Sequence, residues 1–112
     1  MKKPSKYNQF REVLRAALAA GRAAEAANPE DGGACNFDAT AIRLPRWRAD
    51  KVKQAVQEAG TSCYSIKRPG GTVWLITPDT HAQANARSRN AEAVTAALRA
   101  AHWDAFDWCQ LD

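Results

Sequence analysis

The chain has 112 residues, of which 46% are hydrophobic and 25% are charged, and its formal net charge is +4. This size and mix describe one globular domain and exclude disordered and fibrous proteins. No apolar run approaches the roughly 18–20 residues that span a bilayer, and no signal-peptide apolar region follows the amino terminus, so we expect a cytoplasmic protein. The excess of cations favours an anionic partner, but it is smaller than the excess typical of nucleic-acid binders.

An amphipathic helix is predicted for residues 5–27. Its apolar positions recur at three- and four-residue steps over residues 10–21, and it is rich in alanine, the best helix former. This stripe of small residues suits close packing against another helix, such as one from a partner subunit, and it predicts an oligomer. Asn28-Pro29 ends the helix, because the residue before a proline is pushed out of the helical conformation.

The rest of the chain, residues 35–112, predicts an α+β core within the single domain of residues 1–112. The predicted elements are a strand at 35–44, a helix at 48–59, strands at 61–67 and 72–77, a helix at 85–101 and a strand at 103–111. Gly60 stands where the left-handed cap of the first of these helices belongs. The apolar parity changes at Ile42, which predicts a bulge or bend in the first strand.

This order of elements is the split βαβ order of a ferredoxin-like sheet. We therefore predict an antiparallel sheet of about four strands with an extra amino-terminal helix. The two crossover helices cover one face of such a sheet. The other face is then left to the amino-terminal helix or to a second subunit.

Residues with catalytic or metal-binding chemistry do not form a recognisable motif. His81 and His102 are far apart and have no cysteine or acidic neighbour at metal-ligand spacing. Cys35, Cys63 and Cys109 are odd in number and lack metal spacing, so we interpret them as small core residues. Phosphate-loop and dinucleotide fingerprints are absent as well. We expect a protein that is not an enzyme and holds no metal or cofactor.

Cations gather at three places in the sequence. The first segment carries Lys2, Lys3, Lys6, Arg11, Arg15 and Arg22, and a middle group consists of Arg43, Arg46 and Arg48. The third place is a pair at the start of the last predicted helix. That pair, Arg87 and Arg89, lies where the helix dipole disfavours cations by roughly a few tenths of a kcal/mol each. A bound anion would reverse this cost, because helix-start N–H groups and guanidinium forks both attract phosphate oxygens.

Both the arginine pair and the aromatic residues also have a structural interpretation. The two arginines could instead pair with acidic side chains such as Asp104 or Asp107. Phe37 and Trp74 could stack on a base, or they could simply fill the core of a small domain. The predicted strand at 72–77 lacks the basic and aromatic signature of RNA-recognition domains, which makes nucleic-acid binding an alternative rather than the main prediction.

Several segments resemble the signature of a family of small phage proteins. Residues 28–38 read NPEDGGACNFD, residues 44–47 read LPRW, and the blocks at 85–90 and 108–112 are similar too. The family is the first family of Thoeris anti-defence proteins. Its members are non-enzymatic sponges that sequester cyclic ADP-ribose isomers, and some also take up cyclic oligonucleotide signals at a separate site. The resemblance covers residues 28–112.

The resemblance implies an antiparallel sheet with packed helices, ligand pockets between protomers, and assembly as dimers or hexamers. On this resemblance Arg87 and Arg89 would hold the pyrophosphate. Asn85 or Asn90 would bind polar atoms of the ribose or base, and an aromatic side chain such as Phe37 or Trp74 would stack on the adenine ring. The alanines at 84 and 86 depart from the glycine-containing, more basic loop expected of the family.

The sequence thus predicts a phage protein that sequesters a cyclic nucleotide immune signal in the cytoplasm of the infected bacterium, without cleaving it. One alternative is a protein-interaction inhibitor such as an anti-CRISPR, acting through the basic amino-terminal helix and the acidic carboxyl end. The other alternative is a small nucleic-acid-binding module. A membrane partner is not expected.

Overall fold

Three helices and one four-stranded antiparallel sheet make up the fold in the computed structural model. The structure describes residues 5–27, 37–80 and 84–110. Within these ranges it gives the backbone alone for residues 37–38, 84–86 and 109–110. In chain order the elements are α1 (Lys6–Ala27), β1 (Phe37–Ile42), α2 (Ala49–Ala59), β2 (Cys63–Arg68), β3 (Gly71–Ile76), α3 (Ala84–Ala100) and β4 (Ala105–Gln110). The predicted α+β class and amino-terminal helix are confirmed, and the ends of the predicted elements shift by at most two residues. None of the helices in the described ranges is long and apolar enough to cross a membrane.

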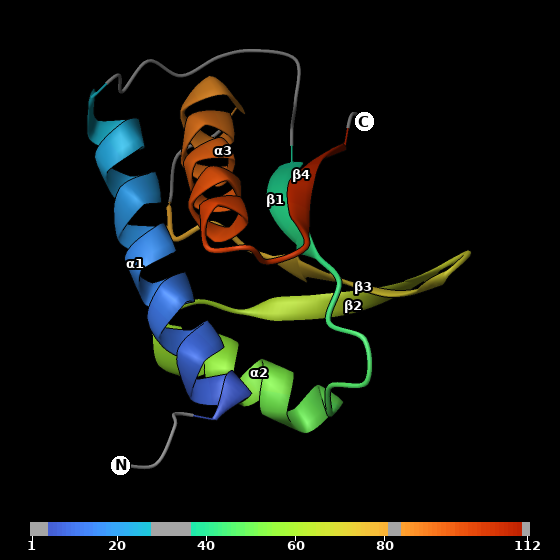
Figure 1. Cartoon of the computed structure of the whole chain (residues 1–112). Helices are drawn as coiled ribbons and strands as arrows, with labels where there is room; N and C mark the ends of the chain where they lie inside the picture. The colour runs from blue at the N-terminus through green and yellow to red at the C-terminus, as the bar shows by residue number, and fades with distance from the viewer. Residues whose placement is uncertain (1–4, 28–36, 81–83, 111–112) are drawn as a thin grey trace.

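The strands lie in the order β2-β3-β1-β4, and every neighbouring pair is antiparallel. The strands that α2 connects, β1 and β2, have β3 between them, and the strands that α3 connects, β3 and β4, have β1 between them. Each βαβ unit is therefore split by one strand. The central pairing is short, from Thr40–Ile76 to Ile42–Trp74, and the β2–β3 hairpin diverges from the β1–β4 pair (Figure 1). This divergence departs from a regular ferredoxin-like sheet.

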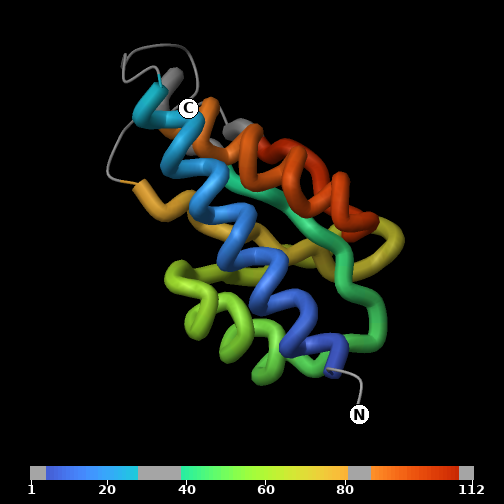
Figure 2. The backbone as a smooth tube through the Cα atoms, turned by 60° about the vertical axis from the view of Figure 1, so that its left-hand side comes forward, coloured from blue at the N-terminus to red at the C-terminus, as the bar shows by residue number. Residues whose placement is uncertain are grey.

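All three helices lie on one side of the sheet, with α1 running along α2 and α3 (Figure 2). The main core joins α1 to the sheet through Phe10, Leu14 and Leu18, which are fully or almost fully buried. The small residues of α1 pack against α3 of the same chain, and a Cβ added to Gly21 would lie 2.3 Å from Asn90 Oδ1. The stripe that predicted a partner subunit is thus filled within the chain and gives no basis for an oligomer.

Strand β1 is buried on both of its faces, which explains the parity change that predicted a bulge. Ala39 and Ala41 are buried on one face, and Thr40 and Ile42 are buried on the other. The pairing of β1 with β4 is regular along its whole length, so the predicted bulge is wrong. The Thr40 hydroxyl shares a hydrogen bond of 2.9 Å with Thr95 of α3, which marks the face of the sheet that the helices cover.

The opposite face of the sheet is covered by none of the three helices (Figure 1). We call it the open face and define it by the strand side chains directed away from the helices, together with Arg43. These side chains are Ala39, Ala41, Tyr64, Ile66, Arg68, Val73, Leu75, Phe106 and Trp108. The amino-terminal helix, one of the two candidates expected to cover this face, packs instead with α2 and α3 on the other side of the sheet.

Candidate ligand-binding cavity

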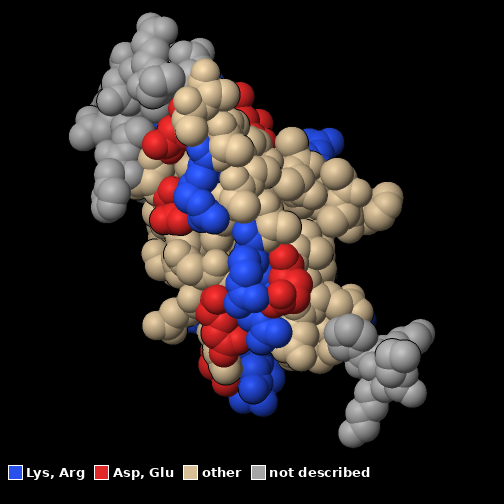
Figure 3. Space-filling model, turned by 90° about the vertical axis from the view of Figure 1, so that its left-hand side faces the viewer, with Lys and Arg blue, Asp and Glu red and all other residues tan. Residues whose placement is uncertain are grey.

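The arginines of α1 form a ladder along the outer surface of the helix, flanked by acidic side chains (Figure 3). The ion pairs are Arg11–Glu12 at 2.9 Å, Arg11–Glu58 at 3.0 Å, Arg15–Glu12 at 2.9 Å and Arg22–Asp79 at 2.7 Å. The charges of Arg11, Arg15 and Arg22 are therefore balanced locally. These contacts also fasten α1 to α2 and to the segment after β3.

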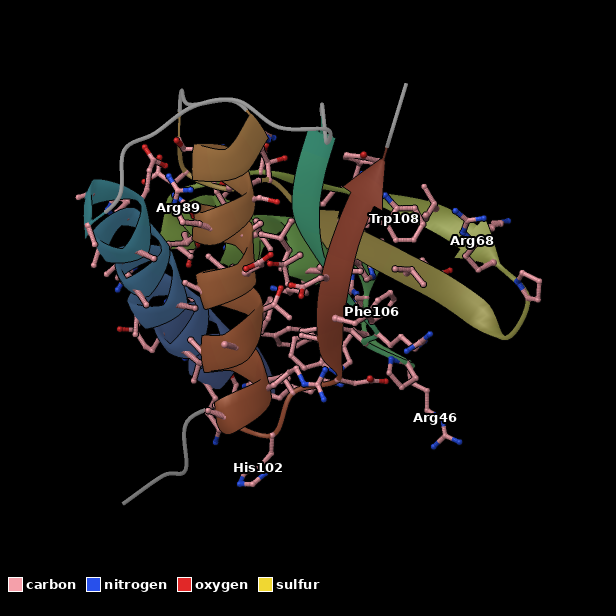
Figure 4. The ribbon with its side chains drawn as sticks, turned by 90° about the horizontal axis from the view of Figure 1, so that it is seen from above. Arg46, Arg68, Arg89, His102, Phe106 and Trp108 are labelled. Atoms are coloured by element: carbon pink, nitrogen blue, oxygen red, sulfur yellow. The ribbon has the colours of Figure 1, made fainter. Side chains whose placement is uncertain are left out.

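At the start of α3, Arg87 and Arg89 are half-buried, and each makes an interaction within the protein. Arg89 lies between α1 and α3 (Figure 4). Asp104, one of the acidic partners expected for this pair, forms an ion pair of 3.5 Å with Arg43. The anion site predicted at Arg87 and Arg89 stays a prediction, and so does the alternative that they pair with acidic side chains such as Asp107.

Asn90 is part of the contact between α1 and α3. Its side chain is 0% exposed, and its Nδ2 donates a hydrogen bond of 3.0 Å to Glu25 Oε1. This burial removes Asn90 from the predicted ligand contacts, because no surface of the residue remains for a ligand. The side chains of Asn85 and Phe37, which were predicted to contact the ligand too, lie outside the described residues.

A cavity of about 530 Å³ lies between the connection from β1 to α2 and the tip of the β2–β3 hairpin. Small-molecule sites have volumes of roughly 300–1,000 Å³. The side chains that give the cavity its chemistry are the cations Arg43 and Arg46, the indoles Trp47 and Trp74, the hydroxyls Ser65 and Thr72, and one acid, Asp104. Cations, flat rings and hydroxyl groups thus meet in one hollow.

Arg46 has a backbone conformation that usually belongs to glycine. The N–H of Trp47 donates a hydrogen bond of 3.2 Å to the carbonyl of Leu44, which closes a turn with Pro45 and Arg46 at its centre. Arg46 has φ 69°. This is the position of a type II turn that prefers glycine, and a non-glycine residue there costs about 1–2 kcal/mol. The Arg46 side chain projects outward from this end of the protein (Figure 4).

The amino-terminal end of α2 forms part of the same cavity through Ala49. The N-cap residue is Arg48, whose side chain makes no capping hydrogen bond and contacts Asp50 at 3.2 Å. The first backbone N–H groups of α2 thus lack a cap from this side chain, and the helix dipole adds partial positive charge. Both features attract an anion to the wall that already carries Arg46.

The two indoles of the cavity are held firmly by their neighbours. Trp74 is only 5% exposed and belongs to the main core, as its structural interpretation predicted, yet its remaining surface lines the cavity. Trp47 contacts Tyr7, Phe10 and Trp103 at ring-centroid distances of 5.0, 5.5 and 5.7 Å. Such fixed rings can offer a flat apolar wall with little loss of side-chain entropy.

The charge of the cavity is positive on balance. Asp104 opposes Arg43 at 3.5 Å, but the two side chains are 62% and 53% exposed, so their ion pair is weak. Arg46 makes no ion pair with any residue that the structure describes. The cavity therefore has a guanidinium group available for an anionic ligand.

Groups suited to covalent or metal chemistry do not converge here. Burial raises the pKa of the Cys63 thiol to about 11, against a smaller opposing effect of Lys53, so the thiol stays protonated at neutral pH. Across residues 5–27, 37–80 and 84–110, no group of His, Cys, Asp and Glu could hold a metal ion. The charged and hydroxyl groups that line the cavity can hold and orient an anion.

Sequence reasoning noted Arg43, Arg46 and Arg48 only as a group of cations and did not place a site there. The available signal was Pro45 in the short connection between a predicted strand and a predicted helix, because proline favours the second position of a turn. Comparisons with protein-family models, with curated proteins and with solved structures found no match.

Proposed function

We propose that this protein binds a small cyclic nucleotide in the cavity and holds it without cleaving it. The observation that carries the proposal is the meeting of Arg43, Arg46, Trp47 and Trp74 beside the uncapped start of α2. Guanidinium forks match the geometry of phosphate oxygens and bind them bidentately, while indole surfaces pack against bases. A nucleotide combines these two recognition elements in a molecule of suitable size.

The resemblance to Thoeris anti-defence proteins supports a cyclic ADP-ribose isomer as the ligand, with cyclic oligonucleotides as a second class to test. On this proposal the protein is a phage sponge that works in the cytoplasm of the infected bacterium. Tight binding would withhold the signal by mass action, so inhibition would need protein in at least stoichiometric ratio to the signal. Assembly as a dimer or hexamer rests on the resemblance alone, and light scattering tests it.

Calorimetry with cyclic ADP-ribose tests the site directly. A hydrogen bond to a charged group is worth about 1.5–3 kcal/mol, so Arg46→Gln is expected to weaken binding by about 10- to 150-fold. Arg22→Gln is the matched control, because it removes the same charge from an exposed position on α1 that pairs with Asp79. Equal affinity in the wild type and Arg46→Gln would place the site elsewhere, and an absence of binding to the wild type would refute the proposal for this ligand.

A second experiment separates a sponge from an enzyme. Heating the complex should release unmodified nucleotide that mass spectrometry identifies and that again activates its receptor. Recovery of a linearised or hydrolysed nucleotide would reveal catalysis. Inhibition by protein at far less than stoichiometric amounts would do the same.

The alternative of a protein-interaction inhibitor gains no support from α1. Its arginines at positions 11, 15 and 22 are each paired with an acidic side chain, so they do not present an uncompensated basic surface (Figure 3). Lys6 lies over the Tyr7 and Trp47 rings at 5.3 and 5.1 Å from their centroids. The cations of this helix serve the packing of the protein itself.

A further inference from the structure

The open face carries a second set of aromatic and cationic side chains, on the side of the sheet opposite to the helices. The register pairs Tyr64 with Leu75 and Arg68 with Gly71, and it pairs Phe106 with Ala41. Because paired residues in a sheet share a face, β2 and β4 both direct aromatic side chains away from the helices. Aromatic rings from both edge strands, β2 and β4, therefore lie on the open face.

Two of these rings are stacked against guanidinium groups. Arg43 lies 4.6 Å from the Phe106 centroid, and Arg68 lies 4.9 Å from the Trp108 centroid. Arg68 reaches from the hairpin toward Trp108 on β4 (Figure 4). Its guanidinium forms no ion pair with any described residue. The open face therefore presents two guanidinium groups, each lying over an aromatic ring.

The apolar floor of this face is already covered. Ala39, Ala41, Val73 and Leu75 are each at most 3% exposed, and Tyr64 at 42% is the one exposed large hydrophobic side chain among the described residues. An apolar partner or a second copy would need a larger exposed apolar patch. In a two-fold contact through this face, Arg68 of one copy would also approach cations of the other.

Charge on the open face favours a polyanion. Its cations are Arg43 and Arg68, and no strand residue in the set that defines this face is acidic. Asp104 lies at the border of the face and pairs with Arg43. The Trp108 Nε1–H is buried and has no acceptor within the described part of the chain, so an acceptor on a ligand would satisfy it after a small movement of the ring.

We propose that the open face binds single-stranded nucleic acid. Bases would stack on Tyr64 and on the outer surfaces of the two guanidinium–aromatic stacks, and phosphates would be attracted by Arg43 and Arg68. Single strands are bound in this way because every base has a flat π-face and each phosphate carries a charge. This site lies on the opposite side of the sheet from Ser65, Thr72 and Trp74 of the cavity. Arg43 lines both sites, whereas Tyr64, Arg68, Phe106 and Trp108 belong to the open face alone, so the proposal does not require that the cavity binds a nucleotide.

Fluorescence anisotropy with labelled oligothymidylate and oligouridylate of about 10 nucleotides tests the proposal at low salt. Stacking of a base on an aromatic side chain is worth about 1–3 kcal/mol, so Phe106→Leu is expected to weaken binding by about 5- to 150-fold. Arg68→Gln should weaken binding too, and it should lower the slope of log affinity against log salt by about 0.7, the value for one phosphate of a single strand. The two oligonucleotides show whether RNA or DNA is preferred.

Two control variants make the outcome decisive. Arg22→Gln removes one charge on the far helical side, and Arg46→Gln removes one charge from the cavity, so both should keep oligonucleotide affinity within a factor of about two. Absence of wild-type binding at low salt, or an equal loss in Arg22→Gln and Arg68→Gln, would overturn the proposal. A dimer in sedimentation analysis that Arg68→Gln strengthens would assign the face to a second copy and would also overturn it. Loss of cyclic nucleotide binding in Arg46→Gln with unchanged oligonucleotide binding would keep the two sites distinct.

Discussion

Replacing Arg46 with glycine is expected to stabilise the fold and to weaken ligand binding at the same time. Arg46 has φ 69°, in the left-handed region, where a side chain costs about 1–2 kcal/mol. Glycine removes this cost but increases the entropy of the unfolded chain, which lowers stability by about 0.5–1 kcal/mol. At the midpoints of these two ranges the free energy of unfolding should therefore rise by about 0.75 kcal/mol, or about 3–6 °C in Tm.

His102 offers a matched control with the same backbone conformation. It has φ 71° and follows α3, where its N–H donates to the carbonyl of Arg99 at 2.9 Å and the N–H of Trp103 donates to that of Leu98 at 3.0 Å. This is a Schellman cap, whose left-handed position prefers glycine. His102 is not among the residues that line the cavity. His102→Gly should give a similar gain in stability and leave the ligand affinity unchanged.

Urea unfolding followed by tryptophan fluorescence measures the stability of both variants, and calorimetry with cyclic ADP-ribose measures their affinity. Arg46→Gln provides the third comparison, because it removes the guanidinium but keeps the left-handed backbone of a non-glycine residue. It should lose affinity without gaining stability. If Arg46→Gly were less stable than the wild type, the strain argument would be wrong. If it bound the ligand as well as the wild type does, the role of Arg46 would be wrong.

Three further predictions concern packing, pH and thiol chemistry. Gly21→Ala places a Cβ 2.3 Å from Asn90 Oδ1 and should lower the free energy of unfolding by about 1–3 kcal/mol. Helix propensity alone predicts the opposite, a gain of about 1 kcal/mol. A higher urea midpoint for the variant would contradict the close contact between α1 and α3. A hydrogen bond from Arg11 is the main cause that lowers the pKa of Glu12 below the ordinary 4.5. The pKa of Glu58 is also lowered, chiefly by a hydrogen bond from Gln54 and next by one from Arg11. The stability that the two ionised carboxylates contribute is therefore present above pH 4.5 and is lost as the pH falls through their lower folded pKa values. Glu58→Gln should therefore flatten the acid side of a Tm-against-pH curve, and an unchanged curve would refute this. Cys63, with a pKa of about 11, should react slowly with iodoacetamide at neutral pH and faster as pH rises, whereas rapid neutral labelling would show an exposed, activated thiol.

The secondary structure could be predicted because its patterns are local. Helical periodicity identified α1 over many turns, and Gly60 ended α2 as predicted, with φ 116° in the left-handed region. The error in β1 had a physical cause, since burial of Ala41 and Ile42 on opposite faces produces the same loss of alternation as a bulge. Periodicity reports which residues are buried but not what covers them.

The candidate site was harder to predict because it depends on tertiary contacts. The cavity joins the segment around Arg46 to the hairpin tip near Gly70 and to Asp104, and nothing local in the sequence indicates that these segments meet. The helix-dipole argument drew attention to Arg89, but its half-buried position between α1 and α3 is visible only in three dimensions (Figure 4). The stripe of small residues that includes Gly21 correctly indicated close packing between helices, but the helix that packs against it is α3 of the same chain.

Titration of the ¹⁵N-labelled protein with cyclic ADP-ribose, followed by amide chemical shifts, tests the central claim most directly. The proposed site predicts that the largest shifts fall on residues 43–49 and 70–74, including the first amides of α2. Amides of the open face near Trp108 should change little. Shifts concentrated at residues 85–90 with residues 43–49 unchanged, or no saturable shifts at all, would contradict a nucleotide site in the cavity.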